Sequence, residues 1–192
     1  MVKTENFEQV EVSSPEALRS WLTQHHQQSE SVWLVTYKKV VPGKYLSTAQ
    51  VLDELLCFGW IDGIRRKLDD RRTMQLIGPR RQQHWAKTYK ERAARLIREG
   101  KMMPAGHASI ERSKTEGLWN FMDDVDALIQ PEDFKHALSD HAPAAQHFAA
   151  FPASVQRFTL RWIKLAKTES TRQRRIQKAA MLAQRNERIP GV

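Results

Sequence analysis

The fold is decided by the stretch Leu56-Cys57-Phe58-Gly59-Trp60-Ile61-Asp62-Gly63. Before it, residues 48–58 repeat apolar side chains at helical spacing, and Ser47 can cap that helix. After it, residues 60–68 and 72–77 have the composition of β-strands and are joined by Asp69-Asp70, a typical turn sequence. Gly59 ends the helix. We therefore predict a helix that leads directly into a β-hairpin.

The sequence before this stretch predicts further elements of a sheet. Residues 31–38 are rich in β-branched and aromatic side chains, and their nearly continuous apolar character predicts a strand that is buried on both faces. Residues 7–12 alternate loosely and can form an edge strand. Ser14 and Pro15 are typical of the N-cap and the first position of a helix.

The C-terminal half has the pattern of helices. Val155, Phe158, Trp162 and Leu165 recur at spacings of three and four residues, which predicts an amphipathic helix. Ser170 can cap a final helix in which Ile176, Ala180 and Ala183 face inward. Three basic side chains of this helix should form an outer surface: Arg174, Lys178 and Arg185.

These patterns predict an α+β protein with a small mixed β-sheet and helices in its N-terminal half and a helical C-terminal half. We expect an α+β domain over residues 1–122, which carries the 56–63 segment and Pro79-Arg80-Arg81. We expect a helical, basic region over residues 131–192, packed on that domain, with a boundary near residues 123–131.

The composition is that of a globular protein, with 192 residues, 41% apolar and 28% charged side chains. No apolar run approaches the length of a membrane span, and the first residues lack the apolar core of a secretory signal. Cys57 is the single cysteine, which fits a reducing compartment. We therefore expect a cytoplasmic protein without a transmembrane segment.

The positive charge is concentrated in two segments. The chain carries a formal charge of +9; residues 64–101 alone carry +9, residues 152–192 carry +8, and the rest is acidic. Clustered positive charge can attract an anionic partner, including nucleic acid or an anionic surface. The alternative is that each segment forms a solvated helix or strand face, and no nucleic-acid-binding module is recognisable.

Several motifs resemble those of the YdeI/OmpD-associated, or bacteriocin-protection, family. They are the 56–63 segment, Pro79-Arg80-Arg81 with Trp85, the segments 96–102 and 104–106, and the C-terminal pairs Ala166-Lys167, Thr171-Arg172 and Arg175-Ile176. The resemblance implies a role in protection from antimicrobial peptides and no particular reaction. Where the family usually has a serine and an asparagine, this chain has His84 and Tyr89. We therefore do not expect a site built from that serine and asparagine.

The candidate site residues surround the 56–63 segment. Asp62 lies in apolar sequence and must find a partner, either as the fixed corner of the fold or as an acid, base or ligand anchor. Arg80 and Arg81 can bind phosphate or carboxylate through paired N–H groups, and Trp85 offers a stacking face. The full set of candidates is Lys38, Trp60, Asp62, Arg65, Arg66, Arg80, Arg81 and Trp85.

We predict a stress or antimicrobial-peptide protection factor that binds an anionic partner through clustered Arg and Lys. Two alternatives remain open: a small-molecule-binding protein or enzyme with its pocket at the corner formed by Trp60 and Asp62, and a scaffold whose helical half binds a protein partner. The histidines show no metal-ligand spacing, and no glycine-rich nucleotide fingerprint is present. We therefore expect neither a metal nor a cofactor.

Overall fold

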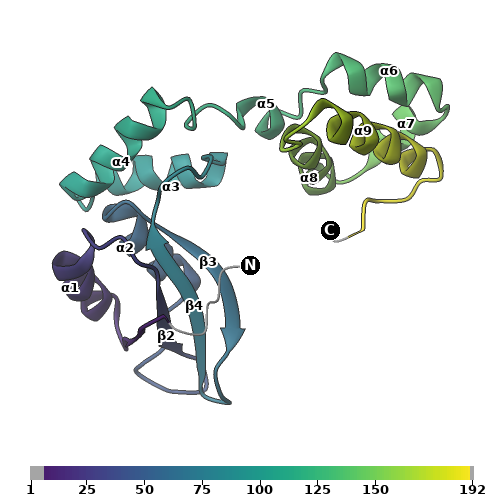
Figure 1. Ribbon diagram of the computed structural model, residues 1–192. Helices are drawn as coiled ribbons and strands as arrows, with labels where there is room; N and C mark the ends of the chain where they lie inside the picture. The colour runs from purple at the N-terminus through teal and green to yellow at the C-terminus, as the bar shows by residue number, and fades with distance from the viewer. Residues whose placement is uncertain (1–6, 191–192) are drawn as a thin grey trace. The chain divides into compact units, whose positions relative to one another are not determined.

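A computed structural model of the protein describes residues 7–190 and confirms an α+β architecture (Figure 1). The chain divides into two compact units, one ending at Asn120 and the other beginning at Phe121. The first unit contains the β-sheet, and the second is helical. In the part of the chain that the structure describes, no helix is long and apolar enough to cross a membrane.

The sheet has four strands in the order β1-β2-β4-β3. They are β1 (Gln9–Glu11), β2 (Val32–Tyr37), β3 (Trp60–Lys67) and β4 (Arg72–Pro79). The short β1 is an edge strand that pairs in parallel with β2, while the other neighbours are antiparallel. The register of β3 against β4 shifts between Asp62 and Arg65. The predicted hairpin is therefore present.

Four helices accompany the sheet in the first unit: α1 (Pro15–His25), α2 (Thr48–Cys57), α3 (Lys87–Arg98) and α4 (Pro104–Thr115). Ser14 accepts a hydrogen bond from the backbone N–H of Ala17 at 3.1 Å, as its predicted N-cap role requires. Ser47 and Gln50 form a capping box at the start of α2. The predicted helix starts are confirmed at both positions.

The core of the first unit lies between one face of the sheet and the helices. Leu18 of α1 and Leu55 of α2 are at most 1% exposed and belong to the same cluster as Leu34 of β2, Ile77 of β4 and Leu96 of α3. Alternate residues along the strands point toward the helices, and helix residues three or four positions apart point toward the sheet. Because α2 is locked into this core, the corner that follows it has a fixed position.

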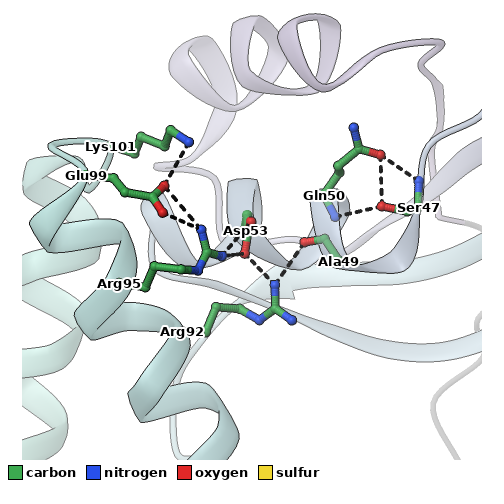
Figure 2. A network of polar contacts seen from close by, with 8 residues as sticks. All are labelled: Ser47, Ala49, Gln50, Asp53, Arg92, Arg95, Glu99 and Lys101. Carbon is green, nitrogen blue, oxygen red and sulfur yellow. Dashed lines mark hydrogen bonds and ion pairs between the residues drawn. The ribbon is translucent and has the colours of Figure 1, made fainter.

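Helices α2 and α3 are also joined by a network of charges (Figure 2). Asp53 of α2 accepts hydrogen bonds from Arg92 and Arg95 of α3, with Arg95 Nη2 at 2.7 and 2.8 Å from the two carboxylate oxygens. Glu99 in turn pairs with Arg95 at 2.9 Å and with Lys101 at 2.8 Å. Several cations of the 64–101 segment are therefore used within the fold.

The second unit contains five helices in residues 121–190: α5 (Asp123–Asp126), α6 (Glu132–Asp140), α7 (Ala144–Ala150), α8 (Ala153–Lys164) and α9 (Glu169–Gln184). Ile176, Ala180 and Ala183 of α9 are at most 1% exposed and pack in a separate core that includes Phe134 and Phe148. The predicted inner face of the last helix is therefore confirmed.

Two details of the C-terminal prediction are wrong. The cap of α9 is Thr168, whose hydroxyl accepts a hydrogen bond from the N–H of Thr171 at 3.2 Å, so the helix begins before Ser170. Leu165 is 38% exposed because it follows the last turn of α8, and Ile163 is buried instead. Local caps of similar chemistry compete within a few residues, and packing selects among them.

Candidate functional site

Arg80 is the centre of the candidate site. It follows the last residue of β4, and its backbone N–H donates to the carbonyl of Gly59 at 2.9 Å. Its side chain is only 2% exposed, and the guanidinium lies over the ring of Trp85 at 4.1 Å and that of Tyr89 at 5.3 Å. The end of β4, bonded to the corner after α2, thus places a cation in the interior of the first unit.

The charge of Arg80 is only partly compensated. Nη1 donates to the carbonyls of Gln83 at 3.0 Å and His84 at 3.4 Å, and no carboxylate among residues 7–190 lies within 4.0 Å of the guanidinium. Burial lowers the pKa of Arg80 to about 10, although the nearby Tyr89 and Asp62 raise this pKa by their negative charge. The Nε atom is buried and has no hydrogen-bond partner within the described part of the chain. An additional anion would therefore complete this environment.

Two more buried side-chain atoms in residues 7–120 lack a hydrogen-bond partner among the described residues. They are the indole nitrogen of Trp85 and the hydroxyl of Ser109, whose residues are 1% and 3% exposed. Trp85 contacts the Arg80 guanidinium, and Ser109 of α4 packs against Gly59, to whose carbonyl Arg80 is bonded. Each of these groups can donate a hydrogen bond. The indole N–H of Trp85, in the ring next to the Arg80 guanidinium, is therefore an additional unused donor that suits an anion.

A cleft of about 350 Å³ opens beside Arg80. Its lining residues are Pro79, Arg80, Arg81, Gln82, Arg112 and Glu116. Arg112 of α4 donates from Nη2 to the backbone carbonyl of Arg80 at 2.7 Å, and Arg81 donates from its own Nη2 to the carbonyl of Ser29 at 2.7 Å. The lining residues thus include three arginines and one glutamate, so their net formal charge is positive.

Asp62 belongs to a neighbouring chain of hydrogen bonds. One carboxylate oxygen accepts from the Tyr89 hydroxyl at 2.5 Å, and the other accepts from Gln75 at 2.9 Å. Gln75 accepts from Arg65 at 2.8 Å, and Arg65 also donates to Thr48 at 3.1 Å. Burial, together with the bond to Asp62, raises the pKa of Tyr89 to about 12. Both oxygens of Asp62 are therefore engaged in fixing β3 to β4 and α3.

The structure brings only some of the predicted residues together. Arg80, Arg81 and Trp85 lie at one end of β4, whereas Lys38 donates to the carbonyl of Asp69 at 2.6 Å, beside the turn at the other end. Eight residues of strand separate the two ends by about 25 Å. Trp60 is 1% exposed and donates from its indole to His26 at 2.9 Å, so it is a core residue.

The remaining predicted arginines of unit one lie on the exposed strand β3. Arg66 places its guanidinium 5.2 Å from the ring of Trp33, and Arg65 is held by Gln75 and Thr48. Other cations of the 64–101 segment have carboxylate partners, among them Lys67 with Asp70 and Arg72 with Asp69 and Glu11. The basic segment is thus divided between ion pairs and a few cations that remain for a ligand.

Sequence reasoning missed Arg112, Gln75 and Ser109. Arg112 and Ser109 belong to α4, far in sequence from Pro79-Arg80-Arg81, and they are three residues apart and so neighbours on the helix surface. A polar residue at the centre of an apolar strand, as Gln75 is in β4, was a usable signal, because a buried amide requires partners. No local signal identified Arg112.

The three cations predicted to form the basic C-terminal surface lie on or next to α9. Arg174, Lys178 and Arg185 are exposed, the first two on α9 and the third at its C-cap. Among the described residues, no group of three or more His, Cys, Asp or Glu side chains is placed to hold a metal ion.

The first unit defines the family of the chain. The family model described as a domain of unknown function, DUF8412, matches residues 10–109, more than half of the 192 residues, and the chain belongs to this family. The model described as bacteriocin-protection, YdeI or OmpD-associated, matches residues 127–186. The resemblance to that second family is therefore confirmed in the C-terminal part, whereas the 56–63 segment lies in the part matched by the first model. No curated protein and no solved structure gives a significant match.

Proposed function

We propose that this protein binds a small anionic ligand, bearing phosphate or carboxylate groups, in the cleft beside Arg80. The observation that carries the proposal is the state of Arg80 among residues 7–190: the residue is 2% exposed, has no carboxylate within 4.0 Å and retains an unpartnered Nε. A buried cation without a counter-ion is costly, and the cost falls when an anion binds. Arg81 and Arg112 would extend the contact toward solvent, where paired N–H groups suit planar or tetrahedral oxyanions.

We further propose that ligand binding underlies a role as a stress or antimicrobial-peptide protection factor in the cytoplasm. The match of residues 127–186 to the bacteriocin-protection family supports the role. A single cysteine, Cys57, which is buried and unpaired, supports a reducing compartment. In this proposal the first unit binds the ligand, and the C-terminal unit is the part that matches the bacteriocin-protection family.

The alternative of a small-molecule or catalytic pocket at Trp60 and Asp62 has less support. Both carboxylate oxygens of Asp62 already accept hydrogen bonds, and the Trp60 indole is satisfied within the core. A ligand at that corner would have to replace these bonds, whereas Arg80 offers unused donors.

Calorimetric titration of the full chain with inorganic phosphate, pyrophosphate and citrate tests the proposal. We expect Arg80→Met to weaken binding of the preferred anion by at least about tenfold, because the buried charge is lost while the stacking volume over Trp85 is kept. Arg112→Gln should weaken it several-fold. Arg98→Gln is the matched control, since Arg98 is exposed on α3 and does not line the cleft.

Circular dichroism on each variant establishes that its fold is retained. Equal affinity in the wild type and Arg80→Met would contradict the proposal. Absence of binding by all three anions at about 10 mM would also contradict it, because any remaining affinity would be too weak for a specific site. A general salt effect would lower affinity in Arg98→Gln as well.

A further inference from the structure

The outer face of α9 forms a surface separate from the cleft of the first unit. Six side chains line a shallow groove of about 340 Å³: Arg174, Gln177, Lys178, Met181, Leu182 and Arg185. Their spacings of three and four residues place all of them on one face of the helix. The opposite face is the one that packs in the core through Ile176, Ala179 and Ala183. One face of α9 thus packs in the core, and the other lines the groove.

The floor of the groove is apolar. Met181 is 46% exposed although it directly follows the core residue Ala180, and Leu182 beside it is partly buried against the core. An exposed thioether side chain is flexible and polarisable, and such side chains are common at surfaces that bind protein partners. The groove therefore offers apolar area that is not used by the fold of this unit.

The rim of the groove is positively charged and without local compensation. Arg174, Lys178 and Arg185 have no carboxylate within 4.0 Å among residues 7–190. Neighbouring arginines of the same helix are used within the unit: Arg172 pairs with Asp133 at 2.8 Å, and Arg175 donates to the carbonyl of Trp162. The cations that point away from the core are the ones left for a partner.

We propose that this face of α9 binds an acidic amphipathic helix of a partner protein. The apolar stripe of that helix would cover Met181 and Leu182, and its Asp and Glu side chains would meet the three cations of the rim. From Arg174 to Arg185 the groove spans about 16 Å, the length of three helical turns. Helix-in-groove recognition uses anchors at this spacing.

The apolar floor favours a protein segment over nucleic acid. A phosphate backbone gains its affinity from contacts to positive side chains, and an exposed Met181 between them adds nothing to such contacts. An acidic amphipathic helix gains from both features, because apolar burial adds to charge complementarity. The proposal does not depend on ligand binding at Arg80, since the two surfaces share no residue.

Fluorescence anisotropy on the full chain tests this inference. The probe is a labelled helical peptide of about 16 residues with Leu at helical spacing and Glu on both flanks of the apolar stripe. The comparison probes are a peptide of the same composition in scrambled order and a labelled duplex DNA. We expect the amphipathic peptide to bind with a Kd in the micromolar range and the scrambled peptide to bind at least about tenfold more weakly.

Two substitutions in the groove should separate its two contributions. Lys178→Glu is expected to weaken peptide binding by at least about tenfold, and Met181→Ser by about fivefold, because one reverses rim charge and the other removes apolar contact. Arg161→Glu is the matched control. It makes the same change in net charge at an exposed position of α8 outside the groove, and it should alter affinity less than twofold.

Three results would overturn the proposal. Equal binding of the scrambled peptide would show unspecific charge attraction. Tighter binding of duplex DNA, with no effect of Met181→Ser, would assign the surface to phosphate contacts instead. An equal loss of peptide affinity in Lys178→Glu and Arg161→Glu would show that the peptide does not bind specifically at the groove. None of these outcomes changes the anion titration at Arg80, so the two proposals fail separately.

Discussion

Titratable groups of three kinds lie close together in the first unit: a guanidinium, a phenol and a carboxylate, from Arg80, Tyr89 and Asp62. Tyr89 donates to Asp62 at 2.5 Å, and the Arg80 guanidinium lies 5.3 Å from the Tyr89 ring. Burial raises the pKa of Tyr89 to about 12 and lowers that of Arg80 to about 10. Tyr89 and Arg80 therefore both lose solvation, and the pKa of each shifts in the direction that favours its neutral form. An incoming anion would favour the charged Arg80.

These shifts predict a pH dependence of folding. The folded state holds the Tyr89 proton more tightly than the unfolded chain, so this contribution to stability is complete below about pH 10 and is lost as the pH rises toward about 12. Arg80 acts in the opposite direction, because its lowered pKa disfavours folding below about pH 10 and this cost falls above it.

Tyr89→Phe isolates the contribution of the phenol. We expect the variant to be less stable than the wild type by about 1 kcal/mol at neutral pH, because Asp62 loses a hydrogen bond. Between about pH 10 and 12 its free energy of unfolding should fall less than that of the wild type. Urea unfolding across this pH range, with tyrosinate absorbance of both proteins, measures the effect. Parallel stability curves would contradict the assigned shift.

The corner between α2 and β3 depends on the backbone of Gly59. This residue has a φ of +72°, and a Cβ placed there would lie 2.9 Å from the carbonyl oxygen of Ala105 and from the Cβ of Ser109. The corner therefore requires both a left-handed conformation and close contact with α4. The same helix α4 carries Arg112, which donates to the backbone carbonyl of Arg80.

Substitution of Gly59 should separate these two requirements. We expect Gly59→Ala to lower the free energy of unfolding by roughly 2–4 kcal/mol, from left-handed strain together with displacement of α4. Gly43→Ala is the matched control, because Gly43 has a φ of +74° and no described atom lies within 4 Å of its Cβ position. Its free energy of unfolding should fall by about 1 kcal/mol. Chemical unfolding measures both. Equal losses would show that contact with α4 contributes nothing.

The whole chain is built from two units with separate hydrophobic cores. Leu18, Leu55 and Leu96 belong to the core of the first unit, and Phe134, Phe148 and Ile176 belong to that of the second. A unit with a core of its own can fold by itself, although one of this size has limited stability.

We therefore predict that residues 121–192 fold when they are expressed alone. The fragment should have a helical circular dichroism spectrum and a cooperative thermal transition, since its core consists of its own residues. Ile176→Ala should lower the midpoint of that transition strongly, because Ile176 is completely buried, and Met181→Ala at an exposed position should change it little. A fragment without a cooperative transition would contradict the prediction.

The sequence by itself determined most of the elements of this protein. Ser14, Ser47, Gly59 and Asp69-Asp70 mark boundaries that the structure confirms, because capping and turn formation depend on neighbours within a few residues. The periodicity of residues 176–183 likewise predicted which face of the last helix is buried. Local chemistry is sufficient for these features.

Only the tertiary structure decided which cations are left to bind a ligand. Arg92 and Arg95 pair with Asp53, 39 and 42 residues earlier, whereas Arg80 is buried with no carboxylate within 4.0 Å among residues 7–190. Arg112 reaches the cleft from α4, 32 residues after Arg80. Ion pairing and burial depend on distances between segments far apart in the sequence, and these distances are fixed only when the core has packed.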